Sequence, residues 1–233
     1  SVDYAINVLA KKHDRPFFLA CGIFRPHLPW YAPKRFFDLY PLEKIRLPQL
    51  LANDLADVPA QGRALSAKRR AEFLNIKKHG KWKEAIQAYL ASISFADAQL
   101  GRLLDALDHS AHRRNTIVVF WSDHGWHLGE KNHWHKSTLW EEATRIPFLI
   151  AAPGVTKGGT TCLRPVDTLS IYPTLLELCG LKPMPGLDGT SIVPLLKNPA
   201  APWAIPAIIE FQRGQCAVRS ERYRYIRYAD GTE

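Results

Sequence analysis

The sequence predicts an α/β fold in which a mostly parallel central sheet lies between helices and a small antiparallel element follows at the C-terminus. Short apolar runs at 16–23, 115–121 and 146–151 have the length and composition of strands buried on both faces. Helical patterns alternate with these runs, and such alternation is typical of an α/β sandwich with a largely parallel sheet.

Three helices are predicted from periodicity and capping. Residues 2–9 carry apolar side chains at helical spacing, and residues 83–108 keep an i, i+3, i+4, i+7 apolar stripe. The third helix spans 167–180, with Asp167 as the N-cap candidate and Gly180 at its end. Pro173 falls in its first two turns, where proline is tolerated best.

The C-terminal runs at 205–211, 215–219 and 223–228 predict short strands of a smaller antiparallel element. We therefore expect a partial α/β domain over 1–200 and the start of a C-terminal subdomain over 201–233. The expected fold is incomplete at both ends.

Charge is concentrated in one segment of the 233 residues. The formal net charge is +9, and residues 63–83 hold eight basic residues against one acid, Glu72. A solvated helical face or loop is the favoured explanation, and a patch for nucleic acid or an anionic polymer is the alternative. No apolar run approaches the roughly 18 to 20 residues of a transmembrane helix. The four cysteines form neither a CxxC metal spacing nor a disulfide-rich framework.

Asp123 and His124 follow the predicted strand at 115–121 directly. Gly125 comes next and permits close approach of the backbone. In α/β sheets, ligands bind where the carboxyl ends of strands meet loops. The pair therefore has three open interpretations, namely a divalent-cation site, an acid–base pair or a structural turn.

The loop after Gly125 is rich in groups that recognise anions and rings. It contains two tryptophans, Lys136 and the three histidines His127, His133 and His135. Cations beside aromatic rings suit an anionic, partly ring-shaped substrate, and loops positioned by a rigid sheet concentrate functional sites. Each histidine taken singly is also explained as a surface or supporting residue.

His27 lies in a segment, 25–33, that three prolines keep out of regular structure. We expect a rigid loop at the end of the strand predicted at 16–23. A histidine held in this way is either a satisfied loop residue or a preorganised proton donor or oxyanion contact.

Six sequence blocks occur in one order along the chain. They are FFLACGIFRPHLPW at 17–30, WSDHGWHLGE at 121–130, WHK at 134–136, ATRIP at 143–147, VDTLSIYPTLLELCG at 166–180 and LDGTS at 187–191. Together they run nearly from end to end of the chain, so they are more specific than any one block alone. Their order resembles the type I sulfatases, closest to the iduronate-2-sulfatase-like branch of the alkaline phosphatase superfamily.

The resemblance implies a sulfuric ester hydrolase with a formylglycine nucleophile and one bound divalent metal, Ca²⁺. It implies that Asp123 and His124 are metal ligands and that Lys136 binds a sulfate oxygen. It also implies that His27 contacts sulfate and protonates the leaving oxygen. Because Ca²⁺ prefers oxygen ligands, His124 has an alternative role on the substrate side of the metal.

The implied substrate is a sulfated small molecule or a sulfated saccharide. We assign the remaining side chains of the loop, His127, His133, Trp134 and His135, to the substrate side of the site. The resemblance also suggests a periplasmic, secreted or lysosomal protein. Nucleic acid is not an expected partner because no helix-turn-helix, zinc or aromatic-sheet motif accompanies the basic run.

The sequence departs from the family pattern at the nucleophile. None of the four cysteines lies in Cys-x-Pro/Ala-x-Arg, and no Asp-Asp pair occurs anywhere. Lys131 also replaces the histidine of the usual Gly-Glu-His. We therefore expect a fragment that is inactive alone. The alternatives are a phosphodiesterase or phosphonate hydrolase of the same superfamily, and a noncatalytic module that binds sulfated polysaccharide through residues 63–83 and the histidine–tryptophan loop.

Overall fold

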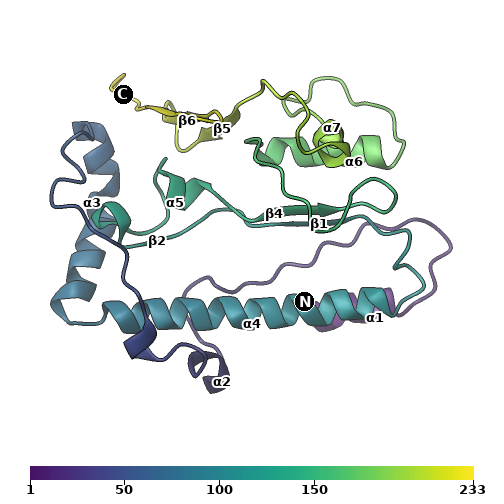
Figure 1. The fold of residues 1–233 in the computed structure, drawn as a ribbon, viewed down its shortest axis with the longest axis horizontal. Coiled ribbons are helices and arrows are strands. Elements are labelled where there is room, and N and C mark those ends of the chain that lie inside the picture. The colour runs from purple at the N-terminus through teal and green to yellow at the C-terminus, as the bar shows by residue number, and fades with distance from the viewer. The chain divides into compact units, whose positions relative to one another are not determined.

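The computed structural model describes residues 1–233 and separates into two compact units, which are described one at a time. Unit 1 comprises Ser1–Gln49 and Glu72–Thr116, and unit 2 comprises Leu50–Ala71 and Ile117–Glu233. Figure 1 shows the elements of both units. None of the helices combines the length and the apolar character needed to span a membrane.

Unit 1 is built around one long helix. This helix, α4 (Trp82–Asp108), is 27 residues long, and both α1 (Val2–Leu9) and the short α2 (Lys34–Phe37) pack against it (Figure 1). A 3₁₀ turn at Leu42–Lys44 also contacts α4. The helices predicted at 2–9 and 83–108 are therefore confirmed.

The strand predicted at 16–23 is wrong. The segment is extended but pairs with no other strand, and its side chains alternate between partly and fully exposed. Phe18, for example, is 83% exposed. An extended chain becomes a strand only when a neighbouring backbone supplies hydrogen-bond partners, and all seven strands of the structure belong to unit 2.

Unit 2 contains the strands β1 (Val118–Trp121) and β4 (Phe148–Ala151), which lie within two predicted strands. They pair antiparallel, with Trp121 opposite Phe148, so the predicted parallel arrangement is not found for this pair. A parallel pair needs a crossover, usually helical. The connection 122–147 holds only two-residue strands and single turns, so it leaves and returns at the same end of the pair.

The other elements of unit 2 are short. The three C-terminal strands form one antiparallel sheet in chain order, which confirms the predicted antiparallel element (Figure 1). The boundary near residue 200 stays a prediction. The elements are β2 (His127–Leu128), a 3₁₀ turn (Glu130–Asn132), β3 (Trp134–His135), α5 (Glu141–Thr144), a 3₁₀ turn (Thr168–Ser170), α6 (Ile171–Leu178), α7 (Val193–Lys197), β5 (Ala207–Glu210), β6 (Cys216–Arg219) and β7 (Arg224–Arg227).

The basic run lies mostly on α3 (Ala60–Lys78), which is 19 residues long. This confirms the helical interpretation of that segment. Its exposed basic residues are Arg63, Lys68, Arg70, Lys77 and Lys78.

The predicted helix at 167–180 is observed as a 3₁₀ turn that continues into α6. Gly180 ends it with a φ of +65°, as expected for a C-terminal glycine. Asp167 makes no side-chain capping bond, because its Oδ2 instead accepts the N–H of Ile208 at 3.2 Å. The proposed N-cap therefore ties the helix to β5.

A buried threonine joins α6 to the segment before α7. Thr174 Oγ1 donates to the Ser170 carbonyl oxygen at 2.6 Å and accepts the N–H of Ile192 at 3.0 Å. The approaching chain passes so closely that a Cβ on Gly189 would lie 2.0 Å from the Leu169 carbonyl oxygen. Glycine is therefore required at position 189 by contact with backbone, which cannot move aside cheaply.

Gly189→Ala is predicted to lower the free energy of unfolding by about 1–3 kcal/mol, because the added methyl group must displace backbone. Gly101→Ala is the matched control, since a Cβ there, within α4, meets no atom within 4 Å. It is expected to raise the free energy of unfolding by about 0.5–1 kcal/mol through helix propensity. Urea denaturation measures both, and equal stability of Gly189→Ala and wild type would contradict the packing described.

Candidate active site

The turn that follows β1 is pressed against α5. The N–H of Gly125 donates to the Ala143 carbonyl oxygen at 2.8 Å, and a Cβ on Gly125 would lie 2.0 Å from the Glu142 carbonyl oxygen. Ser122 Oγ donates to the His124 carbonyl oxygen at 2.9 Å. The backbone that carries Asp123 and His124 is therefore held on both sides.

The side chains of Asp123, His124 and Lys136 meet at this turn. The Nδ1–H of His124 donates to the Gly125 carbonyl oxygen at 2.8 Å, which leaves a lone pair on Nε2. Lys136 Nζ donates to that Nε2 at 2.7 Å, and Asp123 Oδ2 lies 3.5 Å from it. The structure thus gathers a carboxylate, an oriented imidazole and an ammonium from residues that the sequence analysis had selected.

The loop that brings Lys136 back to His124 has an unusual backbone. Lys131, Asn132, His135 and Ser137 have φ values of 51°, 53°, 71° and 78°, and the chain has only one other non-glycine residue in this region. Such residues cost of order 1–3 kcal/mol each and persist only where the surroundings fix them. The path of the loop is therefore set by its contacts rather than by local preference.

Two buried histidines provide part of those contacts. His127 and His133 are both 0% exposed, with ring centroids 4.7 Å apart, and each ring packs edge-on to Trp140 at 5.8 Å. His127 Nε2 bonds with Thr138 Oγ1 at 3.0 Å, and His133 Nε2 donates to the Lys136 carbonyl oxygen at 3.0 Å. These rings are part of the packing beneath the loop.

Burial lowers the pKa of His127 from 6.5 to about 3, and the charges of His133 and Lys131 act in the same direction. His127 is therefore neutral near pH 7. Glu142 Oε2 lies 3.8 Å from His127 Nδ1, which is too long for a hydrogen bond.

The other predicted site residues are distributed differently. Trp134 is 2% exposed, and the ring of His135 packs against Trp126 at an interplanar angle of 46°, with centroids 4.6 Å apart. Direct contact of His127, His133, Trp134 and His135 with substrate stays a prediction, and burial of the first three points to a supporting role. His27 belongs to unit 1, where it is exposed and its Nδ1–H donates to the Leu28 carbonyl oxygen at 2.7 Å.

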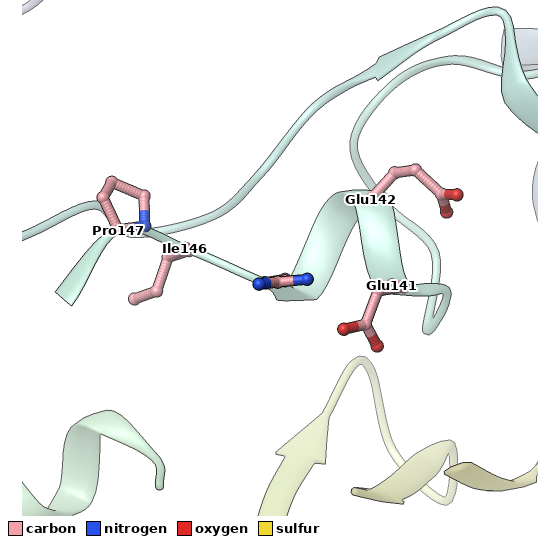
Figure 2. Close-up of a pocket in the computed structure, with 5 residues that line it drawn as sticks. Glu141, Glu142, Ile146 and Pro147 are labelled. Atoms are coloured by element: carbon pink, nitrogen blue, oxygen red, sulfur yellow. The ribbon is translucent and has the colours of Figure 1, made fainter. Parts of the chain in front are cut away.

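Two carboxylates missed by the sequence analysis stand on α5 and point to opposite sides (Figure 2). Glu141 Oε2 accepts from Arg224 at 2.6 Å and from Arg219 at 3.3 Å, which ties α5 to β6 and β7. Burial alone raises the pKa of Glu141, but the hydrogen bonds and charges of the two arginines outweigh it and hold the pKa below its usual value. Glu142 faces His127 instead.

A distant acid also contacts the loop. Lys131 Nζ bonds with Asp54 Oδ1 at 3.2 Å and lies 5.6 Å from the centre of the Trp140 ring. No sequence signal connects Asp54 to Lys131 across 77 positions. Lys131, where the sequence departs from Gly-Glu-His, therefore makes an ion pair with Asp54 and a cation–π contact with Trp140.

An open pocket of about 540 Å³ lies beside α5 and not at the meeting point of Asp123, His124 and Lys136. It is lined by Glu141, Glu142, Arg145, Ile146 and Pro147 (Figure 2). Glu141 already pairs with two arginines, and none of the predicted site residues reaches this pocket. The candidate active site is therefore defined by the side-chain cluster and not by concavity.

The cluster fits part of a cation site. Asp123 offers a carboxylate whose side chain is 83% exposed, whereas His124 Nε2 already accepts from Lys136. No group of three or more His, Cys, Asp or Glu side chains is arranged to hold a metal ion. Asp123 thus supplies at most two of the six to eight oxygen ligands that Ca²⁺ takes.

The comparisons with known proteins agree with the order of the sequence blocks. The family model described as Sulfatase matches residues 1–181. A "Sulfatase" of Formosa agariphila is 43% identical over 100% of the chain and 46% of its own length. Human "Iduronate 2-sulfatase" is 34% identical over 79% of the chain and 40% of its own length. The chain thus spans less than half of these relatives.

A solved structure shares the fold. The phosphonate monoester hydrolase of Agrobacterium radiobacter superposes with a TM-score of 0.78 at 23% identity, covering 98% of the chain and 51% of that chain. The α/β fold class is therefore confirmed, although the fold alone does not separate sulfate from phosphonate chemistry. The family model and the sequence relatives show that the chain belongs to the sulfatase family.

Proposed function

We propose that the cluster of Asp123, His124 and Lys136 forms the anion-binding side of an active site that hydrolyses sulfate esters, and that this chain supplies that part of the site. The observation that carries the proposal is the 2.7 Å contact between Lys136 Nζ and an imidazole nitrogen with an assigned lone pair. This contact orients an ammonium group beside the turn where the family places its chemistry. Membership of the sulfatase family supports the same reaction.

Lys136 acts on the sulfate group in this proposal. An ammonium carries three N–H donors, and the contact with His124 uses one of them. Two donors are left for sulfate oxygens. Because negative charge develops on oxygen as the ester bond breaks, a fixed positive charge lowers the barrier.

His27 is proposed to protonate the leaving oxygen. Its Nδ1–H is engaged with the Leu28 carbonyl oxygen, so Nε2 is the atom that gains and loses the exchangeable proton. The imidazolium form donates from Nε2 to the alkoxide. The short local bond keeps the ring in one orientation for this transfer.

The metal and the nucleophile complete the proposal. We assign Asp123 to a divalent cation, Ca²⁺, whose charge would stabilise the sulfate oxygens when it is bound. His124 is assigned to the substrate side of that cation, because its Nε2 lone pair already accepts from Lys136. The formylglycine nucleophile of the family is assigned to sequence outside residues 1–233, because no cysteine here carries the family signature.

The proposed substrate is a sulfated small molecule or saccharide. The rings of Trp126 and His135 pack against each other beside the cluster, and aromatic rings next to cations suit a sugar ring that carries sulfate. The iduronate 2-sulfatase relative is named for a substrate of this kind.

Lys136→Ala is predicted to weaken the binding of inorganic sulfate by about 10-fold to 100-fold, because one charge-assisted hydrogen bond contributes roughly 1.5–3 kcal/mol. Isothermal titration calorimetry with sodium sulfate measures the dissociation constant. Lys157→Ala is the matched control, since Lys157 is exposed and lies outside the cluster. Equal affinity of Lys136→Ala and wild type would remove Lys136 from the site.

The purified 233-residue chain is predicted to release no sulfate from 4-nitrophenyl sulfate above the rate in buffer. Covalent catalysis needs an activated nucleophile, and Cys21, Cys162, Cys179 and Cys216 all lie outside the required signature. Absorbance of 4-nitrophenolate follows the reaction. Turnover above the buffer rate would show that another residue of this chain serves as the nucleophile.

A further inference from the structure

The buried histidines have no part in the proposed chemistry, yet their hydrogen bonds lead to Lys136. His133 is 0% exposed, and its Nε2–H donates to the carbonyl oxygen of Lys136 itself at 3.0 Å. A carbonyl oxygen only accepts, so the proton is on His133 Nε2. The bond holds the backbone of the residue that carries the ammonium.

His127 holds the same stretch two residues further on. Its Nε2 bonds with Thr138 Oγ1 at 3.0 Å, and that oxygen also accepts the N–H of Trp140 at 3.3 Å. Ser137, between the two held residues, has a φ of 78°. The two imidazoles thus fix both sides of a residue whose backbone conformation is unfavourable by itself.

The pair is in turn fixed by packing. Both rings lie edge-on to Trp140, whose indole is 5% exposed and also has Lys131 Nζ 5.6 Å from its centre. Lys131 is held by Asp54. Because close-packed interiors transmit displacement, a change at either imidazole will move the backbone of residues 136–138.

We propose that His127 and His133 form a brace that fixes the backbone of residues 136–138 and thereby aims the Lys136 ammonium at His124 and at sulfate. This rests on the proposed sulfate-binding role of Lys136. Neither histidine contacts the reacting atoms, so both are positioning residues. The brace explains why two polar rings occupy fully buried positions beneath the loop.

Exchanges at His133 test the brace. His133→Leu removes the donor and keeps apolar bulk, and we expect inorganic sulfate to bind about tenfold more weakly. His133→Gln restores an N–H near the position of Nε2 and should recover most of the affinity. His133→Asn, whose amide reaches only the position of Nδ1, should not. Thr174→Val is the matched control, because it loses a buried hydroxyl that bonds to Ser170 and Ile192 and not to the loop.

A second measurement does not depend on sulfate. The ¹⁵N resonance of His124 Nε2 reports its hydrogen bond from Lys136, so it should shift toward the value of an unpaired imidazole in His133→Leu and return in His133→Gln. An unchanged resonance and unchanged sulfate affinity in the Leu and Asn variants would overturn the brace. If wild type binds no sulfate but the resonance still moves, the proposed function fails and the brace stands.

Low pH is predicted to weaken the brace, because it favours protonation of His127. The groups that face His127 are His133, Glu142, Thr138, Lys131 and the backbone of Glu130. Because the pKa of His127 is 6.5 unfolded and about 3 folded, the unfolded chain binds an extra proton between these values. The contribution of neutral, buried His127 to the free energy of unfolding is therefore full above pH 6.5 and is lost as the pH falls from 6.5 toward 3.

Urea denaturation between pH 7 and pH 4 checks this pH dependence. His127→Gln, which has no titratable ring, should lose stability less steeply than wild type as the pH falls. The carboxylates titrate in both proteins, so the difference between the two curves isolates His127. Parallel curves would show that His127 is not held neutral by burial.

Discussion

The hydrogen bond from Lys136 Nζ to His124 Nε2 is the constraint on which the rest of the site depends. It joins the start of the connection between β1 and β4, at His124, to Lys136 near the middle of that connection. His124 can accept this proton only because its Nδ1–H is already committed to the Gly125 carbonyl oxygen. One local backbone contact therefore sets the tautomer, and the tautomer sets where the ammonium lies.

The parts of unit 2 that surround this bond all restrict the same loop. Gly125 lets the turn after β1 approach α5 more closely than any side chain would allow. On α5, Glu141 is held by Arg224 and Arg219, while Glu142 faces the buried His127. The C-terminal sheet thus contributes to the site indirectly, because it fixes the helix on which the loop rests.

The sequence predicted the helices and the identity of the clustered residues better than it predicted pairing and burial. Apolar periodicity located α4, and the Ser-Asp-His-Gly turn located the cluster, since both signals are local. The segment 16–23 failed as a strand because pairing depends on a partner that local composition does not reveal. Nothing in the sequence distinguishes His127 and His133 from exposed histidines, because only tertiary packing places them in the interior. The contact of Asp54 with Lys131 was equally hidden.

A crystal structure of the protein with inorganic sulfate is the most direct measurement of whether this cluster is an anion site. We expect a sulfate oxygen about 2.7–3.2 Å from Lys136 Nζ, the distance of a hydrogen bond, with His124 Nδ1 still bound to the Gly125 carbonyl oxygen. Sulfate bound elsewhere, with Lys136 in contact with His124 alone, would contradict it.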